Sequence, residues 1–147
     1  MFKIDIHTHI LPENLNELTN TFSDPRFLRM DALDEKTAML RKDDEAFRQV
    51  DCNCWSHHAR TNDCKETSVD VQVLSTIPVL FSYWAKDDEC LKLSQFLNDH
   101  IAEIYRTEST KFIGLGTIPM QNADLAIAEM DRCVNQLNLP GIELGSN

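Results

Sequence analysis

The sequence predicts an α/β protein built around a parallel sheet, and three observations lead to this fold class. Two apolar segments, 71–78 and 112–119, have the length of buried strands, and both end in Thr-Ile-Pro. Apolar residues at helical spacing follow each of them. Further strand-like segments lie near the amino terminus and at 141–145. Strands that alternate with helices form parallel sheets joined by right-handed crossovers.

Each strand-helix unit has its own local signals. Asp87 or Asp88 is the expected N-cap of a helix with apolar positions at helical spacing, namely Leu91, Leu97, Ile101, Ile104 and Tyr105. The next helix is expected to begin at Asn122 or Asp124 and to stop before Pro140. Its predicted stripe is Ala126, Met130, Val134 and Leu137. The four strands are expected near 2–8, 69–77, 111–118 and 141–145.

His7 and His9 are the candidate metal ligands, because they follow directly on the short apolar strand that opens the chain. Alternate side chains of a strand share a face, so both imidazoles are expected to point the same way at the carboxyl end of the strand. In a (β/α) barrel the active site lies at this edge. Ile4 and Ile6 would then pack against the surrounding helices. The alternative is two histidines in a loop or core.

The stretch between the first two strands departs from a simple strand-helix repeat. We interpret 12–55 as a small insertion that covers the mouth of the barrel, with a strand or hairpin arm at 47–51. The segment 56–68 takes the place of the first barrel helix, although only Ala59 and Cys64 are candidates for its buried stripe. We expect one partial barrel domain over residues 1–147.

Composition narrows the possible partners and the location. The formal net charge of -10 argues against nucleic acid and anionic membranes, which bind clustered Lys and Arg. Small molecules and proteins remain. No apolar stretch approaches the roughly 20 residues of a membrane span, and the first strand begins at Phe2, so we expect a cytosolic protein. The five cysteines fit no small-disulfide scaffold and are expected to be reduced thiols.

A second cluster of possible metal ligands lies in the insertion. It consists of Cys52, Cys54, His57 and His58, with Cys64 nearby. The spacing matches no standard zinc module, because a Cys-x-Cys pair is shorter than the usual gap of two to four residues. A structural zinc site and a chance grouping of surface histidines with reduced thiols both remain open.

Four motifs carry a resemblance to a known family. They are IDIHTHILP at 4–12, LSTIP at 74–78, FSYWAK at 81–86 and FIGLGTIPMQ at 112–121. Together they resemble the 2-amino-3-carboxymuconate-6-semialdehyde decarboxylase family. The His-x-His pair alone would indicate only the wider metal-dependent amidohydrolase superfamily. The FSYWAK segment and the GLGTIPMQ segment at 114–121 make the narrower match strong, and the resemblance covers essentially the whole chain.

The resemblance implies a zinc-dependent, non-oxidative carboxy-lyase of the kynurenine route of tryptophan breakdown. Its small-molecule substrate would be 2-amino-3-carboxymuconate semialdehyde and its product 2-aminomuconate semialdehyde. Family members are distorted (β/α)8 barrels and homodimers. His7 and His9 map onto the two zinc ligands of the first strand, and Arg48 maps onto the arginine that grips a substrate carboxylate. A guanidinium fork binds a carboxylate through two parallel hydrogen bonds and keeps its charge.

Four strands amount to the amino-terminal half of a (β/α)8 barrel, which takes roughly 250 residues when complete. By the resemblance, a further histidine, an aspartate and the proton-handling histidine come from later strands, and His100 cannot replace them. We therefore expect no catalytic residue within these 147 residues. Tyr83 and Trp84 are expected to pack under the loops.

The absence of the later strands leads to three functional hypotheses. The chain is a truncated, inactive form of the decarboxylase, a non-catalytic half-subunit that associates with the full-length enzyme, or part of another metal-dependent hydrolase of the same superfamily.

Overall fold

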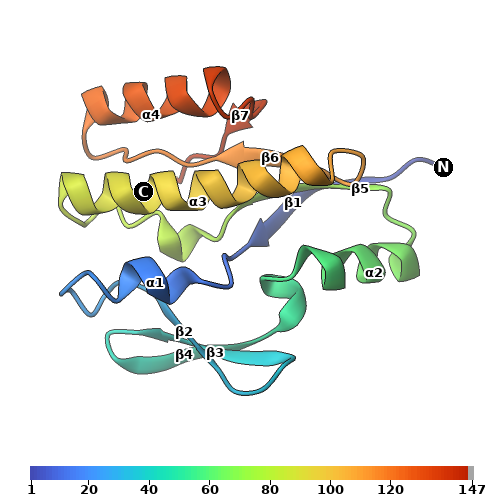
Figure 1. The fold of residues 1–147 in the computed structure, drawn as a ribbon, viewed down its shortest axis with the longest axis horizontal. Helices are drawn as coiled ribbons and strands as arrows, with labels where there is room; N and C mark the ends of the chain where they lie inside the picture. Colours follow the sequence, from blue (N-terminus) through green and yellow to red (C-terminus); the bar gives the residue numbers. More distant parts are fainter. Residues whose placement is uncertain (146–147) are drawn as a thin grey trace.

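A computed structural model describes residues 1–145 and shows two sheets (Figure 1). The larger is parallel and contains β1 (Ile4–Ile10), β5 (Val71–Thr76), β6 (Phe112–Gly116) and β7 (Gly141–Ile142), in chain order. The four predicted strands are therefore confirmed, although β7 is shorter than expected. Each connection between neighbouring parallel strands includes a helix, as a strand-helix barrel unit requires. The α/β fold class is confirmed.

The helices that follow these strands are α2 (His57–Thr67), α3 (Asp87–Thr107) and α4 (Ala123–Asn135). In α3 the predicted apolar positions Leu97, Ile101 and Ile104 are buried. The predicted N-cap is wrong by one residue, because Lys86 occupies that position. The acidic residues 87–89 lie in the first turn, where they interact favourably with the positive end of the helix dipole. Among the described residues, no helix has both the length and the apolar character of a membrane span.

The predicted stripe of α4 is wrong in part. Asn122 is the N-cap, as expected, and its side chain accepts a hydrogen bond from the backbone N–H of Leu125. Met130 and Val134, however, are 42 % and 44 % exposed, and Glu129 is buried instead. Steps of four residues drift around a helix of 3.6 residues per turn, and a carboxylate can take the central buried place only because polar groups of α3 and α4 pair with it.

Strand β1 contains an irregularity that overturns another prediction. Asp5 pairs with Gln72 and Thr8 with Leu74, so three steps on β1 match two on β5. Such a bulge reverses which side chains face the helices. Thr8 and Ile10 are therefore buried, whereas Ile4 and Ile6 are 49 % and 76 % exposed and do not pack against the helices.

The inserted segment forms a small unit of its own. It contains α1 (Leu15–Thr19) and an antiparallel sheet of β2 (Arg29–Ala32), β3 (Thr37–Lys42) and β4 (Glu45–Asp51). The strand expected at 47–51 is thus confirmed. Two short 3-10 helices also occur, η1 (Cys52–Cys54) after β4 and η2 (Pro78–Leu80) after β5. Figure 1 shows this sheet apart from the parallel sheet, with α1 between them.

One apolar core joins the inserted segment to α3, the helix that follows β5. Phe27, Leu28 and Leu40 of the insertion are almost fully buried in the same cluster as Leu93 and Leu97 of α3. Burial of side chains this large stabilises by about 1.5–3 kcal/mol each. The insertion is therefore held at the amino-terminal half of α3, near the carboxyl ends of β1 and β5.

Gly114 of β6 lies in close contact with α3. A Cβ atom added to Gly114 would lie 2.6 Å from Cγ2 of Ile101 and 3.0 Å from Cδ2 of Leu139. We expect Gly114→Ala to lower the free energy of unfolding by about 1–3 kcal/mol, because an overpacked core must shift. Urea unfolding measures the change. Gly141→Ala is the control, since its Cβ would meet only Cδ2 of Leu115 at 3.4 Å. Equal effects of the two substitutions would contradict this packing argument.

Candidate metal and substrate site

His7 and His9 lie together at the carboxyl-terminal part of β1. Their ring centroids are 4.9 Å apart and the rings are nearly perpendicular, at 81°. His7 is exposed and His9 is half-buried. Both line a cavity of about 280 Å³ whose other walls are Thr8, Leu11, Val50, Cys54, Arg60 and Ile77. The cavity thus brings β1 together with the last strand of the insertion and with α2.

A hydrogen-bond chain sets the tautomer of His9. The hydroxyl of Ser75 donates its proton to the backbone oxygen of Thr8 at 3.1 Å. Ser75 Oγ can then only accept from His9 Nδ1, which lies 3.0 Å away. Nδ1 therefore carries the proton, and the lone pair is on Nε2. This is the arrangement of a metal-binding histidine whose other nitrogen is fixed by a hydrogen bond.

The electrostatic surroundings also keep His9 neutral. Burial lowers its pKa, the Glu143 carboxylate opposes this shift, and His7 and Arg60 add to the lowering. Glu143 follows β7, so it lies at the same edge of the parallel sheet as the two histidines. One of its carboxylate oxygens, Oε2, is buried and has no hydrogen-bond partner among the described residues. A neutral imidazole next to a carboxylate suits a divalent cation.

Arg48 is exposed on β4 and is not among the residues that line the cavity. Alternate residues of a strand share a face, so Arg48 lies on the same side of β4 as Val50, which lines the cavity. The two Cα atoms of such a pair are about 6.6 Å apart. The Arg48 guanidinium lies 5.9 Å from the ring centroid of Phe47.

Arg60 is a residue of this cavity that the sequence did not indicate. Its guanidinium donates to the backbone oxygen of His9 at 2.6 Å and to that of Asn53 at 2.8 and 3.1 Å. Burial lowers the pKa of Arg60, but a guanidinium remains charged at neutral pH. Arg60 thus ties α2 and η1 to β1. A lone arginine in a polar segment gives no sequence signal for such a role.

The two aromatic residues after β5 make packing contacts, but Trp84 is 38 % exposed and so is not covered by the loops as fully as the sequence predicts. The ring of Trp84 lies 4.8 Å from Phe27 and 4.0 Å from the Arg26 guanidinium. Tyr83 stacks on Phe81 at 5.5 Å, and its hydroxyl accepts from the backbone N–H of Gly145. Neither aromatic residue lines the cavity that contains His7 and His9.

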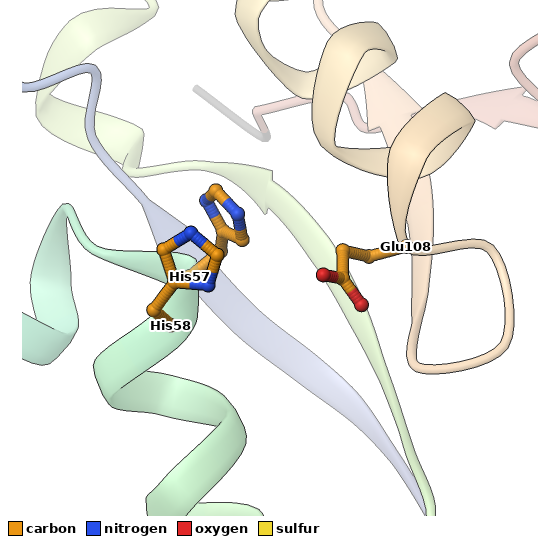
Figure 2. Close-up of side chains that lie close together, drawn as sticks. All are labelled: His57, His58 and Glu108. Carbon is orange, nitrogen blue, oxygen red and sulfur yellow. The ribbon is translucent and has the colours of Figure 1, made fainter.

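The second cluster suggested by the sequence assembles differently. His57 and His58, at the start of α2, come together with Glu108, which follows the last residue of α3 (Figure 2). The cysteines do not join this group among the described residues. Burial raises the pKa of the Cys54 and Cys64 thiols, which makes them poorer ligands. Glu108 was not predicted, because it lies about 50 positions away in the sequence.

Comparison with known proteins identifies relatives over nearly the whole chain. It is 44 % identical over 145 residues to the 2-amino-3-carboxymuconate-6-semialdehyde decarboxylase of Dictyostelium discoideum, and 33 % identical over 165 residues to that of Caenorhabditis elegans. The chain is related in sequence to these decarboxylases. Each alignment covers 99 % of the chain but only 40 % and 41 % of the relative, so the chain spans about two fifths of their length. No protein-family model matches the chain.

Several solved structures have the same fold as this chain. The 5-carboxyvanillate decarboxylase of Sphingomonas paucimobilis superimposes with a TM-score of 0.71 at 19 % identity, over 99 % of this chain and 43 % of that one. The dihydroxybenzoic acid decarboxylase of a Polaromonas species, solved with bound manganese, gives 0.66 at 20 % identity, over 96 % and 37 %. A Staphylococcus aureus amidohydrolase gives 0.69 at 20 % identity, over 100 % and 38 %. The chain thus has the fold of part of an amidohydrolase-type barrel.

Proposed function

We propose that this chain is part of a zinc-dependent, non-oxidative decarboxylase that converts 2-amino-3-carboxymuconate semialdehyde to 2-aminomuconate semialdehyde. The observation that carries the proposal is the His7–His9 pair, with the lone pair of His9 directed to Nε2 by Ser75. The relatives at 44 % and 33 % identity support the substrate. A homodimer, a cytosolic location and a place in tryptophan catabolism belong to the same proposal.

The donor set of the cavity fits a zinc ion. Imidazoles are a ligand type that catalytic zinc sites use, and such sites take three protein ligands. We propose His7 and His9 as two of these ligands. When bound, zinc would act as a Lewis acid and lower the pKa of a coordinated water. The remaining ligands and the proton-handling residue would come from outside residues 1–145.

The residues of this chain would position the substrate. Arg48 would bind a substrate carboxylate through its two parallel N–H groups, which fixes both distance and orientation. Leu11, Val50 and Ile77 form an apolar part of the cavity wall, which strengthens charge interactions by excluding water. Arg60 holds the backbone of His9 and so keeps the imidazole in place.

The test is decarboxylation by the complete enzyme that contains this sequence, measured as carbon dioxide release together with zinc content. We expect His9→Ala to abolish turnover and to remove the zinc bound at this site. Arg48→Gln is expected to raise KM at least about tenfold with a smaller change in kcat, because a charge-assisted fork to a carboxylate contributes about 1.5–3 kcal/mol.

Arg41→Gln is the matched control for Arg48, because Arg41 is a half-exposed arginine on the neighbouring strand and pairs with Asp31 on the enzyme surface. Its kinetic constants should match those of the unaltered enzyme. Full turnover by His9→Ala would refute the metal assignment. If the enzyme instead hydrolyses an amide or ester and releases no carbon dioxide, the proposed activity is wrong and the enzyme is another hydrolase of the amidohydrolase superfamily.

A further inference from the structure

His57, His58 and Glu108 form a group of ligands outside the cavity that contains His7 and His9. Each residue offers one ligand atom, and these three atoms all lie within 4.8 Å of one another. Figure 2 shows both imidazoles at the start of α2 and the Glu108 carboxylate on their side of the loop that follows α3. The donors therefore come from two elements that are far apart in the sequence, and only the fold brings them together.

The chemistry of the three donors suits zinc. An imidazole binds zinc through the lone pair of a ring nitrogen, and a carboxylate binds it through an oxygen. The rings lie 4.1 Å apart between centroids, a spacing at which two protonated rings would repel each other. Glu108 supplies a negative charge. Two histidines and a glutamate are an established set of zinc ligands that leaves a fourth position open.

The surroundings of His57 add further donors. A cavity of about 620 Å³ lies next to the two histidines and is also lined by Glu13, Glu17 and His100. Nε2 of His100 is buried and has no hydrogen-bond partner among the described residues. This cavity and the one that contains His7 and His9 share no lining residue.

We propose that His57, His58 and Glu108 bind Zn²⁺ as a second site, separate from the centre on β1, and that the ion fastens the start of α2 to the end of α3. In α2 a bound ion would add an attachment that apolar packing does not supply, because Cys64 is the single buried residue of this helix. The apolar packing that normally holds a helix to its sheet is therefore weak in α2.

The second site is connected to the cavity on β1 through α2. Arg60 lies one helical turn after His57 and donates to the backbone oxygen of His9. Zinc at the start of α2 would restrain the helix that carries Arg60. The proposal is independent of the decarboxylase activity, because its ligands lie outside the first cavity and its readout is metal binding.

The experiment measures zinc binding in a protein that lacks the first site. In the variant H7A/H9A, equilibrium dialysis with Zn²⁺ should still show one bound ion per chain, and Co²⁺ should give the absorption bands of a low-coordinate site. Adding H58A and E108Q should weaken binding at least about tenfold, since even outer-shell changes cost 10–100-fold. Zinc should raise the midpoint of thermal unfolding in H7A/H9A and not in the quadruple variant.

Glu103→Gln in the H7A/H9A protein is the matched control, because Glu103 is an exposed carboxylate on the same helix and pairs with Arg106. It should leave zinc affinity unchanged. His58 is exposed, so H58A is expected to fold, and circular dichroism verifies this. If H7A/H9A binds no zinc, or if H58A and E108Q leave its affinity unchanged, the second site does not exist. Neither result would affect the proposed function.

Discussion

Replacing Asn98 by alanine is expected to lower the free energy of unfolding by about 3–5 kcal/mol. The Asn98 side chain is fully buried and makes three hydrogen bonds. Nδ2 donates to the backbone oxygen of Thr117 at 2.8 Å and to Glu129 Oε1 at 2.7 Å, while Oδ1 accepts from the backbone N–H of Thr117 at 2.7 Å. Alanine would leave the backbone N–H and the backbone oxygen of Thr117 without this partner, and each such group costs about 1–3 kcal/mol. It would also remove one hydrogen bond to Glu129 Oε1, to which Arg132 still donates.

The loss would spread because Asn98 connects three elements. It lies on α3, Thr117 directly follows β6, and Glu129 lies on α4. Glu129 is 1 % exposed, and its charge is compensated by Arg132, whose pKa is raised mainly by the hydrogen bonds that its guanidinium donates to Glu129. A carboxylate this deeply buried is tolerated only when it is paired and hydrogen-bonded. Asn98→Ala removes part of that compensation.

Urea unfolding followed by circular dichroism measures the effect of Asn98→Ala. Asn135→Ala is the matched control, because Asn135 is an exposed asparagine on α4 whose side chain donates to the exposed Asp131. This control should change the free energy of unfolding by less than about 0.5 kcal/mol. A loss below about 1 kcal/mol for Asn98→Ala would mean that water replaces the amide and that the network is not a structural centre.

Arg60→Ala is expected to lower the free energy of unfolding by about 2–3 kcal/mol. The guanidinium donates to two backbone oxygens, those of Asn53 and His9, and hydrogen bonds from a charged donor stabilise more than neutral ones. Loss of these bonds should also free the segment that carries the candidate metal ligand His9. Arg60→Lys should recover only part of the stability, because an ammonium lacks the planar fork.

Hydrogen exchange separates the local effect of Arg60 from the global one. The backbone N–H of Leu11 donates to the oxygen of Cys54 at 2.8 Å, which connects β1 to η1 beside Arg60. In Arg60→Ala the exchange rate of the Leu11 amide should rise by more than the loss in the free energy of global unfolding explains. Arg106→Ala is the control, since Arg106 is exposed and pairs only with Glu103. An unchanged Leu11 amide would show that Arg60 does not hold β1.

Much of the fold follows from local patterns in the sequence. The strands at β5 and β6 and the apolar stripe of α3 were predicted because buried strands and amphipathic helices leave a periodic signal. The hairpin of the insertion was predicted only in its last arm. Its two-residue turn at Asp43 and Asp44 has φ values of 56° and 59°, a conformation that lacks the usual Asn-Gly signal here. Residues outside the hairpin contact this turn: the backbone N–H of Asp43 donates to the oxygen of Pro25 at 2.8 Å, and Arg29 pairs with Asp44 at 3.0 Å.

The errors have a common physical origin. Ile4 and Ile6 were placed on the buried side of β1 because a regular strand alternates, and the bulge opposite β5 reverses that alternation. Met130 was placed in the stripe of α4 because it is apolar, whereas the buried Glu129 depends on partners from α3. Periodicity reports the chemical type of each side chain, and it contains no information on distant partners.

The sequence by itself determined the alternation of strands and helices and the His-x-His pair, because these depend on residues that are neighbours in the chain. Only the tertiary structure decided what surrounds them. Ser75 directs the lone pair of His9, Arg60 holds its backbone, and Glu108 reaches the histidines of α2. Each of these partners is about 50 or more positions away. Folding, through burial and register, selects such pairs, and short-range patterns leave no trace of them.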